Sequence, residues 1–239
     1  MYLVLCATDD FPALWAARGL RERGLLPLEI VSDKELAFNR GLVHTIIDAQ
    51  PGIEIALADG RVIEGAAVRG TLNRLQTVPA DHIMAAGPKD QQYAQQELFA
   101  LFLSWLHGMP GSVVNRPTPQ GLSGSWRHWS EWCWMAGNSG LATKHYGQDG
   151  NGESYRGSAQ ILTTQTLIVL DNAVFGPSPP ATVAEGCVRL AELSETRLLG
   201  VTFEITRDHL WLVSAITPLP DLRTGGVELL DALASALQK

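Results

Sequence analysis

The chain has little lysine and no concentration of positive charge. Its 239 residues carry 18 lysines and arginines against 25 aspartates and glutamates, which gives a formal net charge of −7. Only four of the positive residues are lysines, and no block of basic residues occurs. Because a nucleic-acid-binding surface needs clustered positive charge to neutralise phosphates, a nucleic-acid partner is not predicted.

Cysteine and long apolar runs are also scarce. The three cysteines, Cys6, Cys133 and Cys187, are far apart and odd in number, which favours reduced thiols in a cytoplasm over a disulfide framework. None lies in a CxxC pair and no two histidines have helical ligand spacing, so no metal site is predicted. No run of 18 apolar residues occurs, and the N-terminus has no positive segment. We therefore expect a cytoplasmic protein with neither a membrane span nor a signal peptide.

The first part of the chain predicts an α/β lobe built on a parallel sheet. Residues 2–6 form a short apolar run typical of a buried parallel strand, a helix opens at Pro12, and residues 28–31 form a second strand. This order places the first loop at the carboxyl edge of the sheet, where open α/β sheets bind ligands. The loop has no GxGxxG pattern, so a dinucleotide site is not predicted.

Two local features of this lobe have a structural interpretation. Asp59 and Gly60 separate two strand-like segments, which predicts a hairpin with a type I′ turn because both central residues can take positive φ. His44 lies in the apolar segment 43–47, and we interpret it as a histidine satisfied within a strand rather than a ligand.

A pair of polar residues follows each of two predicted strands. Asn73 and Arg74 follow the strand 68–72, and Asn115 and Arg116 follow a strand beyond the long helix 89–107. Because a guanidinium pairs bidentately with a carboxylate, these residues are candidates for binding a small anion. A solvated turn is the alternative interpretation.

We place the boundary between two lobes at residues 117–124, so that the first lobe comprises 1–117 and the second 118–239. The second lobe opens with Trp126, Trp129, Trp132 and Trp134, four of the seven tryptophans. On one helix, Trp126, Trp129 and Cys133 share a stripe while the other two indoles point elsewhere. Core packing is one interpretation, and a surface for a protein or peptide partner is the other, since tryptophan is enriched at interface hot spots.

The last third of the chain predicts a platform for a site. Residues 198–216 have the alternation of two antiparallel strands joined at Arg207, and a proline-braced loop with Asp221 and Arg223 follows them. A glycine-rich segment after Tyr146 lacks the GK[ST] ending of a phosphate-binding loop, so we interpret it as a linker.

This order of elements resembles an ATP-grasp protein, particularly the small ligases that join carboxylates to amines. The resemblance is carried by the stretches VVNRP, AGNSGLAT, IVLDNAVFG, LLGVTFEI and WLVSAITPLPD. It implies an α/β chain with an N-terminal parallel-sheet lobe of the pre-ATP-grasp kind. The C-terminal lobe is then a truncated α+β ATP-grasp-like lobe.

The departures from the family's pattern bear on its chemistry. In the family, acidic and Asn side chains hold Mg²⁺, and the positions that match these ligands are here Thr202, Ala215 and Thr217. Glu204 lies two residues beyond Thr202, on the same strand face, and is the nearby acid that could substitute. The missing ligands argue against the family's usual metal-dependent mechanism.

The chain also departs from the family in its phosphate-binding lysines and in its lid. The family holds the nucleotide phosphates with two lysines, and Lys144 is the one lysine between residues 90 and 238. The segment 146–160, where a lid subdomain would stand, is too short to build one. Without a lid, little would exclude water from an acylphosphate intermediate.

Three functions remain open. The favoured one is a non-catalytic accessory protein, without cofactor, that binds a small anionic molecule, a peptide or a partner enzyme, the last through residues 126–134. The second is a divergent ATP-dependent carboxylate–amine ligase that uses Mg²⁺ and ATP. The third is an enzyme of another kind that uses Cys133 with His128 or His145. A homo-oligomer is left open, and no catalytic residue is assigned. The candidate binding residues are Asn73, Arg74, Asn115, Arg116, Arg127, Lys144, Glu204, Asp221 and Arg223.

Overall fold

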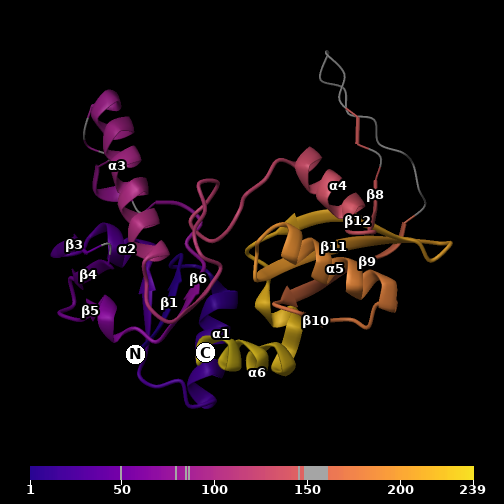
Figure 1. The fold of residues 1–239 in the computed structure, drawn as a ribbon, viewed down its shortest axis with the longest axis horizontal. Coiled ribbons are helices and arrows are strands. Elements are labelled where there is room, and N and C mark those ends of the chain that lie inside the picture. The colour runs from indigo at the N-terminus through magenta and orange to yellow at the C-terminus, as the bar shows by residue number, and fades with distance from the viewer. Residues whose placement is uncertain (49, 79, 84, 86, 145, 148–160) are drawn as a thin grey trace. The chain divides into compact units, whose positions relative to one another are not determined.

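The computed structural model describes residues 1–48, 50–78, 80–83, 85, 87–144, 146–147 and 161–239 (Figure 1). These form two compact units, Met1–Ser125 together with Leu230–Lys239, and Trp126–Leu229. The end of the chain belongs to the first unit, because the closing helix α6 (Gly226–Leu237) begins in the second unit and ends in the first. No helix within the described residues has both the length and the apolar character that a membrane span requires.

The first unit is built around a four-stranded parallel sheet, of which Figure 1 labels β1 and β6. Its strand order is β2-β1-β6-β7. The central strand β1 is buried along its whole length, as its uninterrupted apolar sequence predicts. The crossover helix α1 (Phe11–Glu22) is capped by Asp10, which accepts a hydrogen bond from the backbone N–H of Ala13. The predicted parallel sheet is therefore confirmed. Its strands are β1 (Tyr2–Cys6), β2 (Leu28–Ser32), β6 (Gly70–Asn73) and β7 (Ser112–Val114).

The long helix α3 (Pro88–His107) carries much of the apolar core of the first unit. Phe102 and Trp105 are fully buried and their rings meet edge to face, with centroids 5.3 Å apart. The N-terminal part of the same helix is exposed, and Tyr93 has 66% of its surface accessible. The helix predicted for 89–107 is confirmed, with only its C-terminal half in the core. The shorter helical segments of this unit are α2 (Asp33–Ala37), η1 (Gly65–Ala67) and η2 (Asp81–Ile83).

A three-stranded antiparallel sheet accompanies the parallel one, with β3 (Gly41–Ile47), β4 (Gln50–Ala56) and β5 (Val62–Glu64). The turn between β4 and β5 is not the predicted type I′ turn. Gly60 has a φ of 95°, whereas Asp59 is not among the residues with positive φ. The difference has a physical reason, because the Asp59 carboxylate accepts hydrogen bonds from both the backbone and the side chain of the following Arg61.

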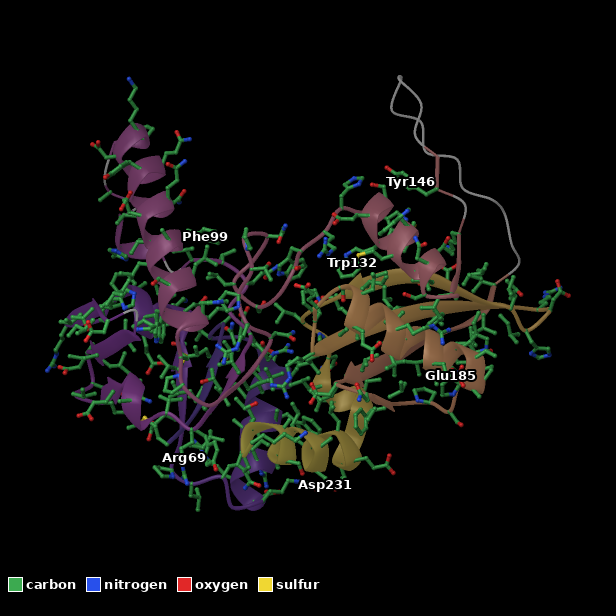
Figure 2. The ribbon with its side chains drawn as sticks, in the orientation of Figure 1. Arg69, Phe99, Trp132, Tyr146, Glu185 and Asp231 are labelled. Carbon is green, nitrogen blue, oxygen red and sulfur yellow. The ribbon has the colours of Figure 1, made fainter. Side chains whose placement is uncertain are left out.

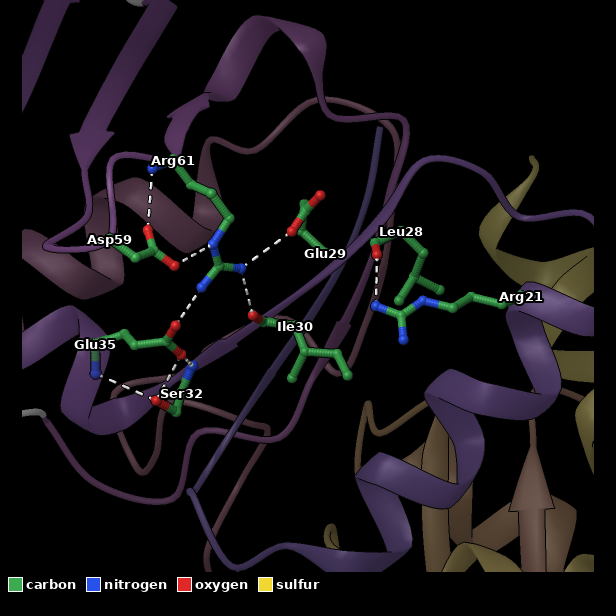
Figure 3. Close-up of polar contacts among 8 residues, drawn as sticks. All are labelled: Arg21, Leu28, Glu29, Ile30, Ser32, Glu35, Asp59 and Arg61. Carbon is green, nitrogen blue, oxygen red and sulfur yellow. Dashed lines mark hydrogen bonds and ion pairs between the residues drawn. The ribbon is translucent and has the colours of Figure 1, made fainter.

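Arg61 ties the β4–β5 turn to two other elements (Figure 3). Its Nη1 donates to the Glu29 carboxylate on β2 at 3.0 Å, its Nε donates to Asp59 at 2.6 Å, and its Nη2 forms an ion pair with Glu35 on α2. Glu35 also closes a capping box with Ser32 at the start of α2. One guanidinium therefore holds three carboxylates together.

Replacing Arg61 with methionine should destabilise the protein by about 1–2 kcal/mol at pH 7, because three carboxylates lose their shared cation at a half-exposed site. Hydrogen bonds from the backbone and side chain of Arg61 hold the pKa of Asp59 below its ordinary value. A lowered carboxyl pKa stabilises the folded state above the ordinary value of about 4, and this contribution disappears as pH falls through the folded pKa.

The difference in unfolding free energy between Arg61→Met and the wild type should therefore shrink between pH 7 and pH 3.5, as measured by urea denaturation. Arg40→Met is the matched control, because Arg40 is exposed and forms no ion pair with a described residue. A difference that stays constant with pH would contradict this account.

The second unit is built around a five-stranded sheet with the order β10-β9-β11-β12-β8 (Figure 1). Neighbouring strands are antiparallel except β12 and β8, which are parallel, so the sheet is mixed. The predicted hairpin is confirmed, because β11 and β12 are its two antiparallel strands. The helices α4 (Trp129–Asn138) and α5 (Ala181–Leu193) share one core with the sheet. The strands are β8 (Ala142–Thr143), β9 (Ile161–Leu170), β10 (Ala173–Phe175), β11 (Leu198–Thr206) and β12 (Trp211–Thr217).

The tryptophan-rich segment differs from its prediction. The helix α4 begins at Trp129, with His128 as its N-cap, so Trp126 lies before the helix and cannot share a helical stripe. Trp132 is buried in the core of the second unit (Figure 2), although the predicted stripe turned it away. Trp134 is the tryptophan of α4 that remains exposed, with 64% of its surface accessible. The prediction failed because it turned the wrong face of the helix inward, whereas the buried residues of α4 are Trp132, Met135 and Ala136.

Candidate functional site

One face of the sheet in the second unit carries a row of polar side chains. The strand register places Thr202 opposite Thr166 and Glu204 opposite Thr164. The hydroxyls of Thr166 and Thr202 share a hydrogen bond of 3.0 Å. Side chains of alternate residues point to opposite faces, and the intervening Val201 and Phe203 lie in the core with α4 and α5. The polar row is therefore on the face away from these helices.

The positions that the resemblance assigns to metal ligands meet on this same face. Thr202 pairs with Ala215, and Gly200 pairs with Thr217, across β11 and β12. Two hydroxyls and a methyl group thus stand where the resemblance implies carboxylate and amide oxygens. Their convergence could not be derived from spacing alone, because a register shift separates Thr202 from Phe203 in the pairing of these strands.

Lys144 and Glu204 form an ion pair on this sheet. The Nζ of Lys144 lies 2.5 Å from a carboxylate oxygen of Glu204, and the two side chains are 35% and 21% exposed. Lys144 directly follows β8, which is the parallel neighbour of β12, and this pairing brings the lysine toward β11. The cation proposed for phosphate and the acid proposed for metal are therefore joined in one ion pair.

These residues differ from the ligand set that the resemblance implies for Mg²⁺ and ATP. Mg²⁺ is usually bound by one or two carboxylates with water and substrate phosphates. Glu204 is the one carboxylate among the described residues of this face, and its charge is matched by Lys144. No group of three His, Cys, Asp or Glu side chains in the described part of the chain is arranged to hold a metal ion. The segment 146–160, in which the lid is predicted to be missing, lies outside the described residues apart from 146 and 147.

In the first unit, three of the predicted binding residues gather at the carboxyl end of the parallel sheet. Arg74 is 4% exposed, and its Nε and Nη2 donate to the two carboxylate oxygens of Asp10 at 2.7 and 3.1 Å. The buried Asn73 donates from its amide to the backbone carbonyls of Asn115 and Leu122, at 2.9 and 2.6 Å. Asp10 could not be identified as the partner from the sequence, because it lies 64 residues before Arg74. These contacts hold the loops at the sheet edge together.

The other candidate residues lie elsewhere in the fold. Arg116 donates from its two terminal nitrogens to the backbone carbonyls of His107 and Gly111. Arg127 forms an ion pair with Glu131, and its guanidinium lies 6.0 Å from the ring centroid of Trp132.

Asp221 and Arg223 bond to each other at the start of the short helix η3 (Leu222–Gly225). The hydrogen bond and charge of Asp221 raise the pKa of Arg223 above its ordinary value. Like Arg116 and Arg127, this exposed pair already has partners within the chain.

The structure gives no support to a cysteine nucleophile. Burial raises the pKa of the Cys6 and Cys187 thiols to about 12, and it also raises the pKa of Cys133. Thiols with raised pKa stay protonated near neutral pH and are poor nucleophiles. His128 is used as the N-cap of α4, where its Nδ1 accepts from the backbone N–H of Ser130. His145 lies outside the described residues.

The outer surface of α4 carries the exposed Trp134 in a row with charged and polar side chains. Glu131, Trp134 and Asn138 follow one another at intervals of three or four residues, which places them along one side of the helix, and Arg127, just before the helix, joins them through its ion pair with Glu131. We call these four residues the α4 stripe. An exposed indole beside an ion pair has the composition of an interface hot spot. The sequence drew attention to the segment, but only the packing of α4 in the structure identifies Trp134 as its exposed tryptophan.

No family model matches the chain, and no curated protein matches it. Several solved structures do. The macrocyclase MdnC bound with precursor peptide MdnA from Microcystis aeruginosa MRC has a TM-score of 0.73 at 10% identity, covering 98% of this chain and 97% of that chain. The ATP-grasp ligase PsnB complexed with minimal precursor, Mg and ADP has a TM-score of 0.71 at 16% identity, covering 100% and 98%. The RiPP-associated ATP-grasp ligase from Chryseobacterium gregarium, in complex with ADP and a leader and core peptide, has a TM-score of 0.71 at 9% identity, covering 98% and 96%.

These likenesses agree with the short motifs quoted above and with the observed sheets. Each extends over nearly all of both chains, so both the parallel-sheet unit and the mixed-sheet unit have counterparts. At this level of identity they establish the architecture of the protein. The chain has an ATP-grasp-like α/β fold.

Proposed function

We propose that the protein is a peptide-binding accessory protein that uses an ATP-grasp-like fold without ATP-dependent ligation. The observation that carries the proposal is the polar sheet face of the second unit. There Thr202, Ala215 and Thr217 replace the oxygen ligands that the resemblance implies, and Glu204 is bound to Lys144. A face with this composition offers Mg²⁺ few oxygen ligands, and its acid and its lysine neutralise each other.

The peptide partner is supported by a different set of observations. MdnC, whose fold is similar, was solved with a precursor peptide bound, and PsnB was solved with a minimal precursor. The α4 stripe offers Trp134, which loses little conformational entropy on binding, and an adjacent ion pair that can position a peptide. Binding of a peptide through this stripe requires no nucleotide.

Peptide binding can be tested with synthetic peptides encoded by the short reading frames beside the gene, labelled with fluorescein and titrated by fluorescence anisotropy. One of them should bind in the absence of nucleotide, and Trp134→Ser should weaken binding at least tenfold, about 1.4 kcal/mol. Leu210→Ser is the matched control, because Leu210 is an exposed apolar residue of the same unit that lies outside the stripe. Failure of every peptide to bind, or binding that is indifferent to Trp134→Ser, would contradict the proposal.

A divergent ligase is the second candidate, because the similar structures include ligases solved with ADP. In that case the ion pair between Lys144 and Glu204 would open, so that the lysine holds phosphate and the acid holds metal. Glu204→Gln would then abolish ADP formation in the presence of the bound peptide. A rate of ADP formation that is unchanged in Glu204→Gln would show that Glu204 does not hold a catalytic metal.

A further inference from the structure

The first unit contains a cavity of about 540 Å³ that is unrelated to the sheet face of the second unit. It lies between the three-stranded sheet, the C-terminal end of α3 and the loop that leads into β7. Its lining includes His44 and Ile53 from the sheet, Trp105 from α3, and Arg116 beyond β7. The volume falls within the roughly 300–1,000 Å³ that is usual for small-molecule sites.

The elements that form the walls of this cavity pack closely against one another at two glycines. A side chain at Gly108 would overlap the ring of Pro51, and a Cβ at Gly65 would lie 2.6 Å from Cγ2 of Ile53. These glycines therefore allow the loop and the η1 turn to approach β4 directly. Because the contacts are between packed elements, the cavity is formed before any ligand enters.

Arg116 gives the cavity a positive charge that no acid of the lining matches. Eight of the described arginines form an ion pair with an acid, and Arg116 is not among them. None of the twelve lining residues is aspartate or glutamate. The bonds to His107 and Gly111, at 2.7 and 3.2 Å, orient the guanidinium and use two of its five N–H donors. The remaining donors are suited to a carboxylate.

The other polar groups of the lining are fixed or buried. His44 donates from Nδ1 to the backbone carbonyl of Gly52 at 2.8 Å, while its Nε2 is bonded to the hydroxyl of Ser104 at 2.8 Å. Both ring nitrogens are therefore occupied, which confirms His44 as a satisfied strand histidine. Trp105 is 2% exposed, and its Nε1 has no hydrogen-bond acceptor among the described residues. The lining is thus mostly apolar, with one cation and no acid.

From these features we infer that the cavity binds a small organic monocarboxylate with an apolar body. The carboxylate pairs with Arg116, and the apolar body packs against Pro51 and Met109. A single guanidinium matches one negative charge, whereas a phosphate dianion would lack a second cation here. The inference is independent of the proposed peptide binding, because every lining residue belongs to the first unit.

The test is a titration of the full-length protein with benzoate and indole-3-acetate, each compared with its uncharged amide, by calorimetry and ligand-detected NMR. At least one carboxylate should bind, and its amide should bind at least tenfold more weakly. Arg116→Met should lower the affinity for that carboxylate at least tenfold. Arg207→Met, which removes the same charge from an exposed loop of the second unit, should leave it unchanged.

A second variant separates binding from folding, because Arg116 also holds two backbone carbonyls. Ala66 is exposed and lines the cavity, so Ala66→Trp should fill it and abolish binding while Arg116 keeps its contacts. No binding of either carboxylate at millimolar concentration would overturn the inference. Equal binding of acids and amides, or binding that survives both Arg116→Met and Ala66→Trp, would overturn it as well.

Discussion

Replacement of Arg74 by methionine should destabilise the first unit by about 3–5 kcal/mol, the usual cost of removing one partner from a buried ion pair. Arg74 is 4% exposed and Asp10 is 12% exposed, so the carboxylate left behind would be poorly hydrated. The loss would also release the loop after β1 from the end of β6, since the side chains of these two residues join them. Chemical denaturation followed by circular dichroism measures the change.

A double variant separates charge from packing. Asp10→Asn keeps an oxygen that can cap α1, but it removes the stranded negative charge. Asp10→Asn combined with Arg74→Met should therefore be more stable than Arg74→Met alone. If the double variant is as unstable as the single one, or if Arg74→Met costs less than about 1 kcal/mol, the buried pair does not have the role assigned to it.

Gly70→Ala should be nearly as damaging, because it tests the packing of the C-terminal helix on the parallel sheet. A Cβ at Gly70 would overlap the backbone carbonyl oxygen of Leu237 and lie 3.0 Å from its carbonyl carbon. A backbone group cannot rotate aside as a side chain can, so the end of α6 must move. We expect a loss of about 3 kcal/mol, the upper end of typical overpacking costs, and a fall in Tm of roughly 6–12 °C.

Gly41→Ala is the matched control for this change. Gly41 lies in strand β3, and a Cβ there would meet no atom within 4 Å. Its Tm should differ from that of the wild type by no more than about 2 °C, since surface substitutions usually change stability by less than 0.5 kcal/mol. Equal effects of the two substitutions would show that strand propensity, rather than contact with α6, determines the loss at Gly70.

The elements that could be predicted from the sequence are those whose pattern is local. The apolar run of β1 predicted a buried parallel strand, and the alternation from Leu198 predicted the hairpin of β11 and β12. The start of α4 was missed because a histidine N-cap is a weaker sequence signal than serine or aspartate. The return of α6 to the first unit depends on contacts such as that between Gly70 and Leu237, which are far apart in the chain.

The candidate site illustrates the same limit. The sequence predicted that Asn73, Arg74 and Asn115 stand at strand ends, and the structure brings them to one edge. The sequence could not predict that Asp10 would form an ion pair with Arg74, because that pairing depends on how α1 and β6 approach β1. Lys144 and Glu204 are also far apart in the sequence. Their ion pair forms only because β8 joins the sheet beside β12, which the sequence could not predict.

Loss of nucleotide binding can be measured by calorimetric titration of the full-length protein with Mg²⁺ and ATP. We expect no saturable heat up to millimolar nucleotide, because the sheet face offers one carboxylate that is already bound to Lys144. PsnB, whose structure was solved with Mg and ADP, serves as the positive control under the same conditions. Saturable micromolar binding of Mg·ATP that is lost in Lys144→Met would contradict this expectation and favour the divergent ligase.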